Sequence, residues 1–336
     1  MRRYTGTSLF VGALSVVYLF STQQAPDGVK LAYRSYNPQS VAEIYTGDWA
    51  VDPVALDGLL YLPEGEGPFP VVFLQHGNGG REGLQQWWDV IVPALLDAGI
   101  GGFIGDSWAG RGLDRPNPEK MTFAARITDV FMALDALSKH PRVDPARIGI
   151  SGYSFGGGLA ITAAYDRVAQ SVLGDGVRFA AHLPVYPNCL HRFENAPMTG
   201  APVHMLLGAS DTQTPPKYCV TLAAQLQESG APVTYKIYPE VGHGFVKATG
   251  RVQEGMANVD GCGVWQVKNN GHIESNGISS QKQTYADFVK ALTRYCGKRA
   301  NLESFGIRAS QDRARDDTVA FFKKHLRRKM LSGPTS

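Results

Sequence analysis

The chain has 336 residues, of which 43% are hydrophobic and 19% are charged; it can therefore bury a large core and does not have the composition of a disordered protein. Its formal net charge is only +3. Much of this excess lies in the C-terminal sequence KKHLRRK, and no basic stripe interleaved with aromatic residues occurs elsewhere, which argues against a nucleic-acid partner.

The N-terminus differs from the rest of the chain. Arg2 and Arg3 precede an uncharged apolar stretch, residues 8–20, which has the length of the apolar region of an export signal and is short for a membrane span. Residues 1–25 are therefore predicted to be an export signal, and the protein to be periplasmic or secreted. The cleavage site is not clear, so an uncleaved N-terminal anchor remains the alternative and is the only membrane contact that we expect.

Six short runs rich in apolar and β-favouring residues follow, with helical stretches between them. The clearest helical stretch is 121–140, where apolar residues recur at spacings of three and four. Strands that are apolar on both faces and alternate with helices predict an α/β fold, with a mostly parallel sheet between two layers of helices. The six runs are 68–77, 99–107, 147–151, 177–186, 203–211 and 233–239.

A serine lies where the third run ends, between two glycines in the sequence GYSFG, residues 152–156. A sharp turn from strand to helix needs small residues at both glycine positions. The turn projects the serine above the carboxyl edge of the sheet, beside the positive end of the next helix. The pattern G-x-S-x-G is weak alone, but here a strand precedes it and a helix follows it. It therefore indicates that Ser154 is a nucleophile.

A serine hydroxyl needs a base and a group that orients the base. His243 follows the last run and has a glycine on each side, and Asp211 ends the run before it. The order Ser154, Asp211, His243 is that of the α/β-hydrolases. No rival combination fits all three strand ends; the rivals are His76, His182, His191 and His272 for the base, and Glu240 and Asp175 for the acid.

The glycine-rich sequence LQHGNGGREG follows the apolar strand 71–74. Its glycines let backbone N–H groups turn toward the nucleophile, where they stabilise the oxyanion that forms when a carbonyl is attacked. We predict that the N–H groups of Asn78 and Phe155 are these donors. Four neighbours of the motifs are predicted as substrate contacts: His76, Trp108, Arg111 and Tyr153.

Five segments together resemble the dienelactone hydrolase branch of the α/β-hydrolase superfamily: HGNGG, GDSWAGRG, GYSFGGG, GASDTQTP and YPEVGHGF. The resemblance covers about residues 59–245 and the final helix, 315–326. It implies the α/β-hydrolase fold, with a mostly parallel eight-stranded sheet and helices on both faces. It also implies ester or lactone hydrolysis without a cofactor or metal, with Ser154, His243 and Asp211 as nucleophile, base and acid. The founding members use a cysteine nucleophile, so lactone specificity does not carry over.

Because the founding members act on acidic substrates, an arginine near the site is a candidate for binding a substrate anion. Arg81 follows the glycine-rich loop, and Arg111 lies in GDSWAGRG. Asp106 and Asp114 are close to Arg111 in sequence and favour an internal ion pair for it instead. Arg81 is expected to be largely solvated.

Residues 26–336 are predicted to form a single α/β-hydrolase domain, with an insertion at about 247–309 before the final helix. The insertion either overhangs the active site and affects substrate choice, or it is a surface addition without such a role. Four cysteines in an exported chain suggest disulfides. We expect Cys189 to pair with Cys219, because neighbouring strands bring them together, and Cys262 to pair with Cys296, because these bracket the insertion.

The sequence thus predicts a serine hydrolase that cleaves a small-molecule carboxylic ester or lactone through an acyl-enzyme. A peptidase similar to prolyl oligopeptidase shares the order of the three residues and is the runner-up. Such peptidases usually carry a large propeller or lid domain, for which the N-terminal part of this chain is too short. A non-catalytic secreted binding module on the same fold is the third alternative.

Overall fold

The computed structural model describes residues 27–327 except 115, 118, 249 and 259. The predicted export signal, residues 1–25, lies outside the described residues. No helix within the described part of the chain is both long and apolar enough to cross a membrane. The division into signal, domain and insertion stays a prediction.

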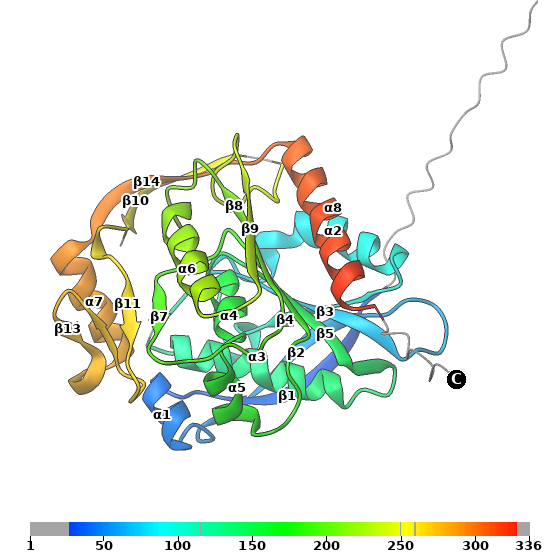
Figure 1. Ribbon diagram of the computed structural model, residues 1–336, viewed down its shortest axis with the longest axis horizontal. Coiled ribbons are helices and arrows are strands. Elements are labelled where there is room, and N and C mark those ends of the chain that lie inside the picture. The colour runs from blue at the N-terminus through cyan, green and yellow to red at the C-terminus, as the bar shows by residue number, and fades with distance from the viewer. Residues whose placement is uncertain (1–26, 115, 118, 249, 259, 328–336) are drawn as a thin grey trace, which may run out of the picture.

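The central element is an eight-stranded sheet with the strand order β1-β2-β4-β3-β5-β6-β8-β9 (Figure 1). Only β2 runs against the others: it pairs antiparallel with β1 and β4, and every other neighbouring pair is parallel. The predicted fold is thereby confirmed. The strands are β1 (Val29–Tyr36), β2 (Pro53–Tyr61), β3 (Phe69–Gln75), β4 (Gly101–Asp106), β5 (Val143–Tyr153), β6 (Ala181–Val185), β8 (Val203–Gly208) and β9 (Val233–Tyr238).

The six predicted runs coincide with β3, β4, β5, β6, β8 and β9. Strands β1 and β2 do not appear among them. Both strands alternate between buried and exposed positions, as expected where one face of a sheet is less covered. Their apolar signal is therefore weaker than that of the strands buried on both faces.

Helices cover both faces of the sheet. On one face, Val72 and Leu74 of β3 join a core with α2 (Gln85–Asp97) and α8 (Arg308–His325). On the other face, Val71 and Phe73 join a core with the remaining large helices. Successive side chains of a strand point to opposite faces, so one strand supplies both cores. The helices of the second face include α3 (Phe123–Ser138), α5 (Asp166–Leu173) and α6 (Pro216–Glu228).

Helix α3 corresponds to the predicted helix 121–140 and begins after Thr122, whose side chain accepts the N–H of Ala125. The sequence pattern predicted one buried face, but α3 is buried around most of its circumference, including Arg126 and Asp129. The helix packs against β1, β5 and α5 at once. This deep burial places two charged side chains in the interior, next to the candidate site.

The predicted insertion forms a separate layer at one end of the molecule (yellow to orange in Figure 1). Its two ends pair as an antiparallel ribbon, β10 (Arg251–Asn258) with β14 (Lys298–Ser304). Between them lie β11 (Trp265–Val267), β12 (Ile273–Ser275), β13 (Ile278–Ser279) and α7 (Tyr285–Cys296). Strand β7 (His191–Phe193) pairs parallel with β11 and so joins the insertion to the main body.

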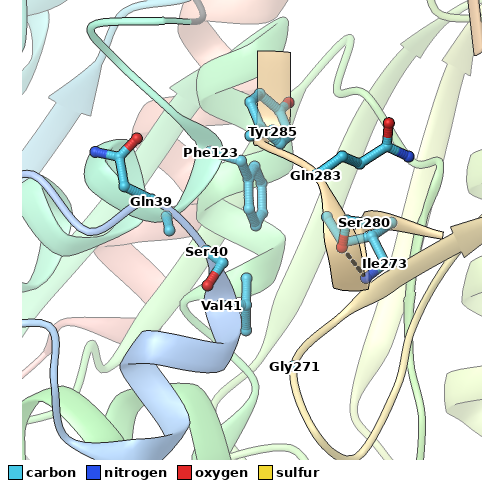
Figure 2. A pocket seen from close by; sticks show the side chains of 10 residues that line it. Gln39, Ser40, Val41, Phe123, Gly271, Ile273, Ser280, Gln283 and Tyr285 are labelled. Atoms are coloured by element: carbon cyan, nitrogen blue, oxygen red, sulfur yellow. Dashed lines mark hydrogen bonds between the residues drawn. The ribbon is translucent and has the colours of Figure 1, made fainter. Parts of the chain in front are cut away.

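Figure 2 shows where the insertion meets the main body. Phe123 lies between Val41, at the start of α1 (Val41–Thr46), and Tyr285, at the start of α7. The cavity there has a volume of only about 20 Å³. The ring of Phe123 also stacks on His191 of β7, with 4.2 Å between ring centres. The insertion is therefore packed on the main body through apolar and aromatic contacts.

Both predicted disulfides are present. Cys189 is bonded to Cys219 and Cys262 to Cys296, with 5.1 Å between the Cα atoms in each pair. The first joins the chain after β6 to helix α6. The second closes the insertion, because Cys262 lies just after β10 and Cys296 just before β14.

Candidate active site

Ser154 lies at the turn between β5 and α4 (Phe155–Thr162), with φ 58° and ψ −118°. This left-handed conformation is strained for a residue with a side chain. A Cβ atom on Gly152 would collide with the carbonyl oxygen of Gly156, and one on Gly156 with the carbonyl oxygen of Gln75. The glycines predicted to permit the turn are thus the residues that the packing requires.

The structure brings the three predicted residues together. Ser154 Oγ lies 2.9 Å from His243 Nε2, and His243 Nδ1 lies 2.8 Å from Asp211 Oδ2. The serine hydroxyl donates to Nε2 when Nδ1–H donates to the carboxylate. The second carboxylate oxygen of Asp211 accepts the N–H groups of Gln213 (2.9 Å) and Thr214 (2.8 Å). Ser154, His243 and Asp211 therefore form one hydrogen-bonded chain.

The Thr214 hydroxyl also belongs to this chain of hydrogen bonds, and we did not predict it. Its Oγ1 lies 2.9 Å from Asp211 Oδ2, 3.1 Å from His243 Nδ1 and 3.1 Å from the carbonyl oxygen of Tyr186. The sequence DTQT carries a signal for this contact. An aspartate often accepts the N–H groups that follow it in a turn, which brings the side chain three residues on back toward the carboxylate.

The glycine-rich loop after β3 lies against the turn at Ser154. A Cβ atom on Gly77 would be 3.0 Å from Ser154 Cβ and 3.6 Å from the backbone nitrogen of Phe155. Only glycine allows this approach. Asn78 and Ser154 line the same cavity, which has a volume of about 490 Å³. The two predicted oxyanion donors are thus carried by segments in direct contact.

Arg126 of α3, which we did not predict, supports this loop from the interior. Its Nη1 donates to Asn78 Oδ1 (2.7 Å), and its Nη2 donates to the carbonyl oxygens of His76 (3.1 Å) and Gly77 (3.3 Å). The guanidinium carbon lies 4.0 Å from the centre of the Phe155 ring. Burial lowers the pKa of Arg126 to about 9. No motif marked this residue, because it lies in an ordinary helix.

Of the four predicted substrate contacts, only Tyr153 lines the cavity. His76 is buried, and its ring spans between Gly77 and Ser107: Nδ1 donates to the Gly77 carbonyl oxygen (2.8 Å), and Nε2 accepts the N–H of Ser107 (3.2 Å). Trp108 packs against His76. The cavity is lined by Gly77, Asn78, Gly79, Gly80, Gly83, Leu84, Pro116, Tyr153, Ser154, Tyr186, Gln213, His243, Gly244 and Lys247.

The two arginines that follow the motifs differ from expectation. Arg111 forms an internal ion pair with Asp129 of α3, a partner that its sequence neighbours did not suggest: Nη1 and Nη2 lie 2.8 and 2.9 Å from the two carboxylate oxygens. Asp106 instead accepts backbone N–H groups at the start of the next turn. The Arg81 side chain is only 27% exposed and lies 3.8 Å from Asp106, so it is not largely solvated. For Arg111, sequence proximity misled because the fold brings α3 to this loop; Arg81 is partly covered because the end of β4 lies beside the glycine-rich loop.

The rival histidines and acids lie elsewhere. His182 is buried and donates to the carbonyl oxygen of Ala160, and His191 is packed among aromatic rings. Glu240 pairs with Arg313 on the surface. Within the described residues, no group of three or more His, Cys, Asp and Glu side chains is arranged to hold a metal ion.

A residue near the end of the insertion is hydrogen-bonded to the loop that carries His243. The N–H of Phe305 donates to the carbonyl oxygen of His243 (2.9 Å), and the N–H of Gly242 donates to that of Phe305 (3.1 Å). Among described residues of the predicted insertion, only Lys247, at its first position, lines the cavity. The described part of the insertion therefore contacts the histidine loop through Phe305 and, apart from Lys247, does not line the cavity.

The chain is similar in sequence or structure to several known proteins. A protein of Mycobacterium tuberculosis, described as uncharacterized, is 29% identical over 207 residues, which are 57% of this chain and 69% of that protein. A putative dienelactone hydrolase from Klebsiella pneumoniae is similar in structure with a TM-score of 0.45, at 18% identity over 65% of this chain and 89% of that chain.

A dienelactone hydrolase-like promiscuous phosphotriesterase from metagenomic libraries has a TM-score of 0.52, at 13% identity, over 89% of this chain and 99% of that chain. At this identity the likeness shows the shared fold alone. The model of the dienelactone hydrolase family matches residues 56–267, a range that holds Ser154, Asp211 and His243. The chain therefore belongs to the dienelactone hydrolase family and is a hydrolase.

Proposed function

We propose that the protein is a serine hydrolase that cleaves carboxylic esters through an acyl-enzyme, with Ser154, His243 and Asp211 as the catalytic residues. The observation that carries this proposal is the chain of hydrogen bonds from Ser154 Oγ through His243 to Asp211, at 2.9 and 2.8 Å. Membership of the dienelactone hydrolase family supports hydrolysis as the reaction class.

In the first half of the proposed reaction, Ser154 Oγ bonds to the ester carbonyl carbon while its proton passes to His243 Nε2. The Asp211 carboxylate stabilises the imidazolium, and the N–H groups of Asn78 and Phe155 receive the oxyanion. When the tetrahedral intermediate collapses, the bond to the leaving alcohol breaks and His243 gives that oxygen its proton. Water then repeats the sequence on the acyl-serine and releases the acid.

The cavity beside Ser154 suits a small ester. Its volume of about 490 Å³ falls in the range usual for small-molecule sites. Leu84, Pro116, Tyr153 and Tyr186 supply apolar surface, and Asn78, Gln213 and Lys247 supply polar groups. Such a mixed lining fits an ester that carries both apolar and polar groups.

We also propose that the protein works outside the reducing cytosol. Two disulfides support an oxidising compartment. The export signal at residues 1–25 remains a prediction from the sequence.

The test compares the purified protein with Ser154→Ala on aryl esters of increasing acyl length, set beside peptide and lactone substrates. The substitution is expected to lower ester turnover by on the order of a millionfold. Ser210→Ala, in an exposed position next to Asp211, is the control and should stay within about threefold of the wild-type rate. Unchanged ester turnover in Ser154→Ala would exclude the proposal, and cleavage of peptides alone would favour the peptidase.

A further inference from the structure

Arg126 is a buried cation whose hydrogen-bond acceptors are all neutral. It is 2% exposed, and its two terminal nitrogens donate to two backbone carbonyl oxygens and one amide oxygen. Asp129, one turn along the helix, is engaged by Arg111 at 2.8 and 2.9 Å and by the Ser35 hydroxyl at 2.6 Å. Among the described residues, no carboxylate forms an ion pair with Arg126.

Both segments that carry the proposed oxyanion donors touch this one guanidinium group. Asn78 accepts its shortest hydrogen bond, at 2.7 Å, and the ring of Phe155 lies under its plane, 4.0 Å from the guanidinium carbon. The carbonyl oxygens of His76 and Gly77 fix the loop just before Asn78. Arginine has a planar fork of donors that can hold several acceptors while its face stacks on a ring.

We infer that Arg126 is a positioning residue for the oxyanion hole, which holds the Asn78 and Phe155 segments beside each other and whose positive charge, without a directly bound counterion, is available to the anion that forms on the substrate. The inference rests on the proposed function and adds a residue to its machinery.

The charge matters because of where it lies. A buried cation without a directly bound counterion raises the energy of the resting protein. Asp129 favours the charge of Arg126, but its carboxylate is already bound by Arg111. When the carbonyl oxygen becomes an anion in the neighbouring cavity, the two opposite charges attract through an interior that screens them less than water does. The interaction is absent from the neutral ester and present in the transition state, so it lowers the barrier without tightening substrate binding.

The chain offers a matched control in Arg142, at the opposite end of β3. Arg142 also donates to two backbone carbonyl oxygens, of Pro63 (3.0 Å) and Gly65 (2.6 Å). Its guanidinium carbon lies 5.5 Å from the centre of the Phe69 ring. Because Phe69 begins β3 and the candidate site lies beyond its other end, loss of Arg142 removes similar contacts far from the reaction.

The experiment measures kcat and KM for an aryl ester with the wild type, Arg126→Met, Arg126→Lys and Arg142→Met, together with melting temperatures. It also measures the affinity of an alkyl boronic acid, which takes the serine oxygen onto boron and forms a tetrahedral anion, with the serine proton passing to the histidine. This adduct resembles the transition state in charge and shape, whereas KM reports mainly on the neutral ester.

We expect Arg126→Met to lower kcat about 10- to 100-fold, less than the full loss of an oxyanion donor, and to change KM less than about threefold. Boronate affinity should fall by a factor similar to that for kcat/KM. Arg126→Lys keeps a charge but loses the fork and should recover part of the rate. Arg142→Met should keep kcat within about twofold of the wild type, even if it melts at a lower temperature.

The inference is overturned if Arg126→Met keeps kcat within threefold of the wild type, if Arg142→Met loses as much, or if KM rises while boronate affinity is unchanged. Should Arg126→Met not fold, Arg126→Lys decides, with a kcat reduced about fivefold or more and a parallel loss of boronate affinity as the supporting result. A wild-type protein that neither hydrolyses the ester nor binds the boronate contradicts the proposed function itself.

Discussion

The two halves of the candidate site are held in place by different parts of the chain. Ser154 and its neighbours depend on close packing inside the central sheet, where Gly152 and Gly156 leave no room for side chains. His243 instead lies in a loop that is hydrogen-bonded to Phe305, about sixty residues further on, near the end of the insertion. The half that carries Ser154, the proposed nucleophile, is therefore encoded by a short motif. The base half, which carries His243, the proposed base, depends on a distant segment of the chain.

The largest expected effect comes from removing the His243 side chain, the proposed base. His243→Ala should lower kcat/KM of ester hydrolysis nearly as much as loss of Ser154, on the order of a millionfold, and Asp211→Asn by about 10⁴-fold. The smaller second effect is expected because Asp211 orients the ring and does not itself take the proton. Steady-state kinetics on the purified variants measures both. Near-normal activity in His243→Ala would rule out the assigned base.

The insertion disulfide tests how far the base half depends on the insertion. Replacing Cys262 and Cys296 together by alanine opens a loop with a sequence separation of 34 residues, which is expected to lower the free energy of unfolding by about 3 to 4 kcal/mol. The ribbon β10–β14 runs from this disulfide toward Phe305. Urea unfolding measures the loss.

The matched control for this change is Cys189 with Cys219, which closes a loop with a separation of 30 residues. In the chain-entropy model it should cost nearly the same free energy of unfolding. An unfolding free energy unchanged by the loss of Cys262 and Cys296 would show that the cross-link does not hold the insertion in place.

Acid should weaken the docking of the insertion through His191. This buried ring stacks on Phe123 and contacts Trp265 of the insertion, and burial, together with the charge of Arg192, lowers its pKa to about 3. Its folded pKa lies below the unfolded value of about 6.5. The stability that it contributes is therefore present above pH 6.5 and is lost as the pH falls toward 3, by up to about 1.4 kcal/mol per pH unit.

His191→Phe keeps an aromatic ring at this position and removes the proton-binding group. Between pH 6.5 and pH 4, the free energy of unfolding of this variant should fall less steeply with pH. The difference in slope should correspond to about one proton fewer taken up on unfolding. Equal slopes for the two proteins would contradict the assigned burial of a neutral His191.

The smallest expected effect concerns Thr214. Thr214→Val removes the hydroxyl that contacts Asp211 and His243 while keeping the shape of the side chain. One lost hydrogen bond to a charged group is typically worth about 1.5 to 3 kcal/mol, so kcat should fall about 10- to 150-fold. Thr214→Ser keeps the hydroxyl and should stay near the wild-type rate. If both variants behave alike, the hydroxyl has no part in orienting the base.

The sequence was enough to predict what local patterns encode. The sharp turn at Ser154 follows from its two glycines, the six buried strands from their apolar runs, and the two disulfides from the positions of the cysteines. The contact of Ser154, His243 and Asp211 then follows from the rule that parallel strands end at the same edge of a sheet.

The contacts of Arg111 and Arg126 could not be predicted, because they depend on packing between elements that are distant in sequence. The pairing of Arg111 with Asp129 and the contact of Arg126 with Asn78 both require α3 to be buried against the loop after β3. In the sequence, α3 has the pattern of a helix with one apolar face. The charges next to Arg111 in sequence were therefore taken as its partners, whereas its ion pair with Asp129 joins it to a helix that only the fold brings near.

The central claim, that Ser154 is an activated nucleophile, is tested most directly with a fluorophosphonate probe on the folded protein. The phosphorus atom bonds to the serine oxygen and fluoride leaves, so labelling adds a fixed mass at one residue. The account predicts labelling of the wild type at Ser154, identified by peptide mapping, with none in Ser154→Ala and strongly slowed labelling in His243→Ala. A folded wild-type protein that stays unlabelled, or that is labelled at another residue, would contradict it.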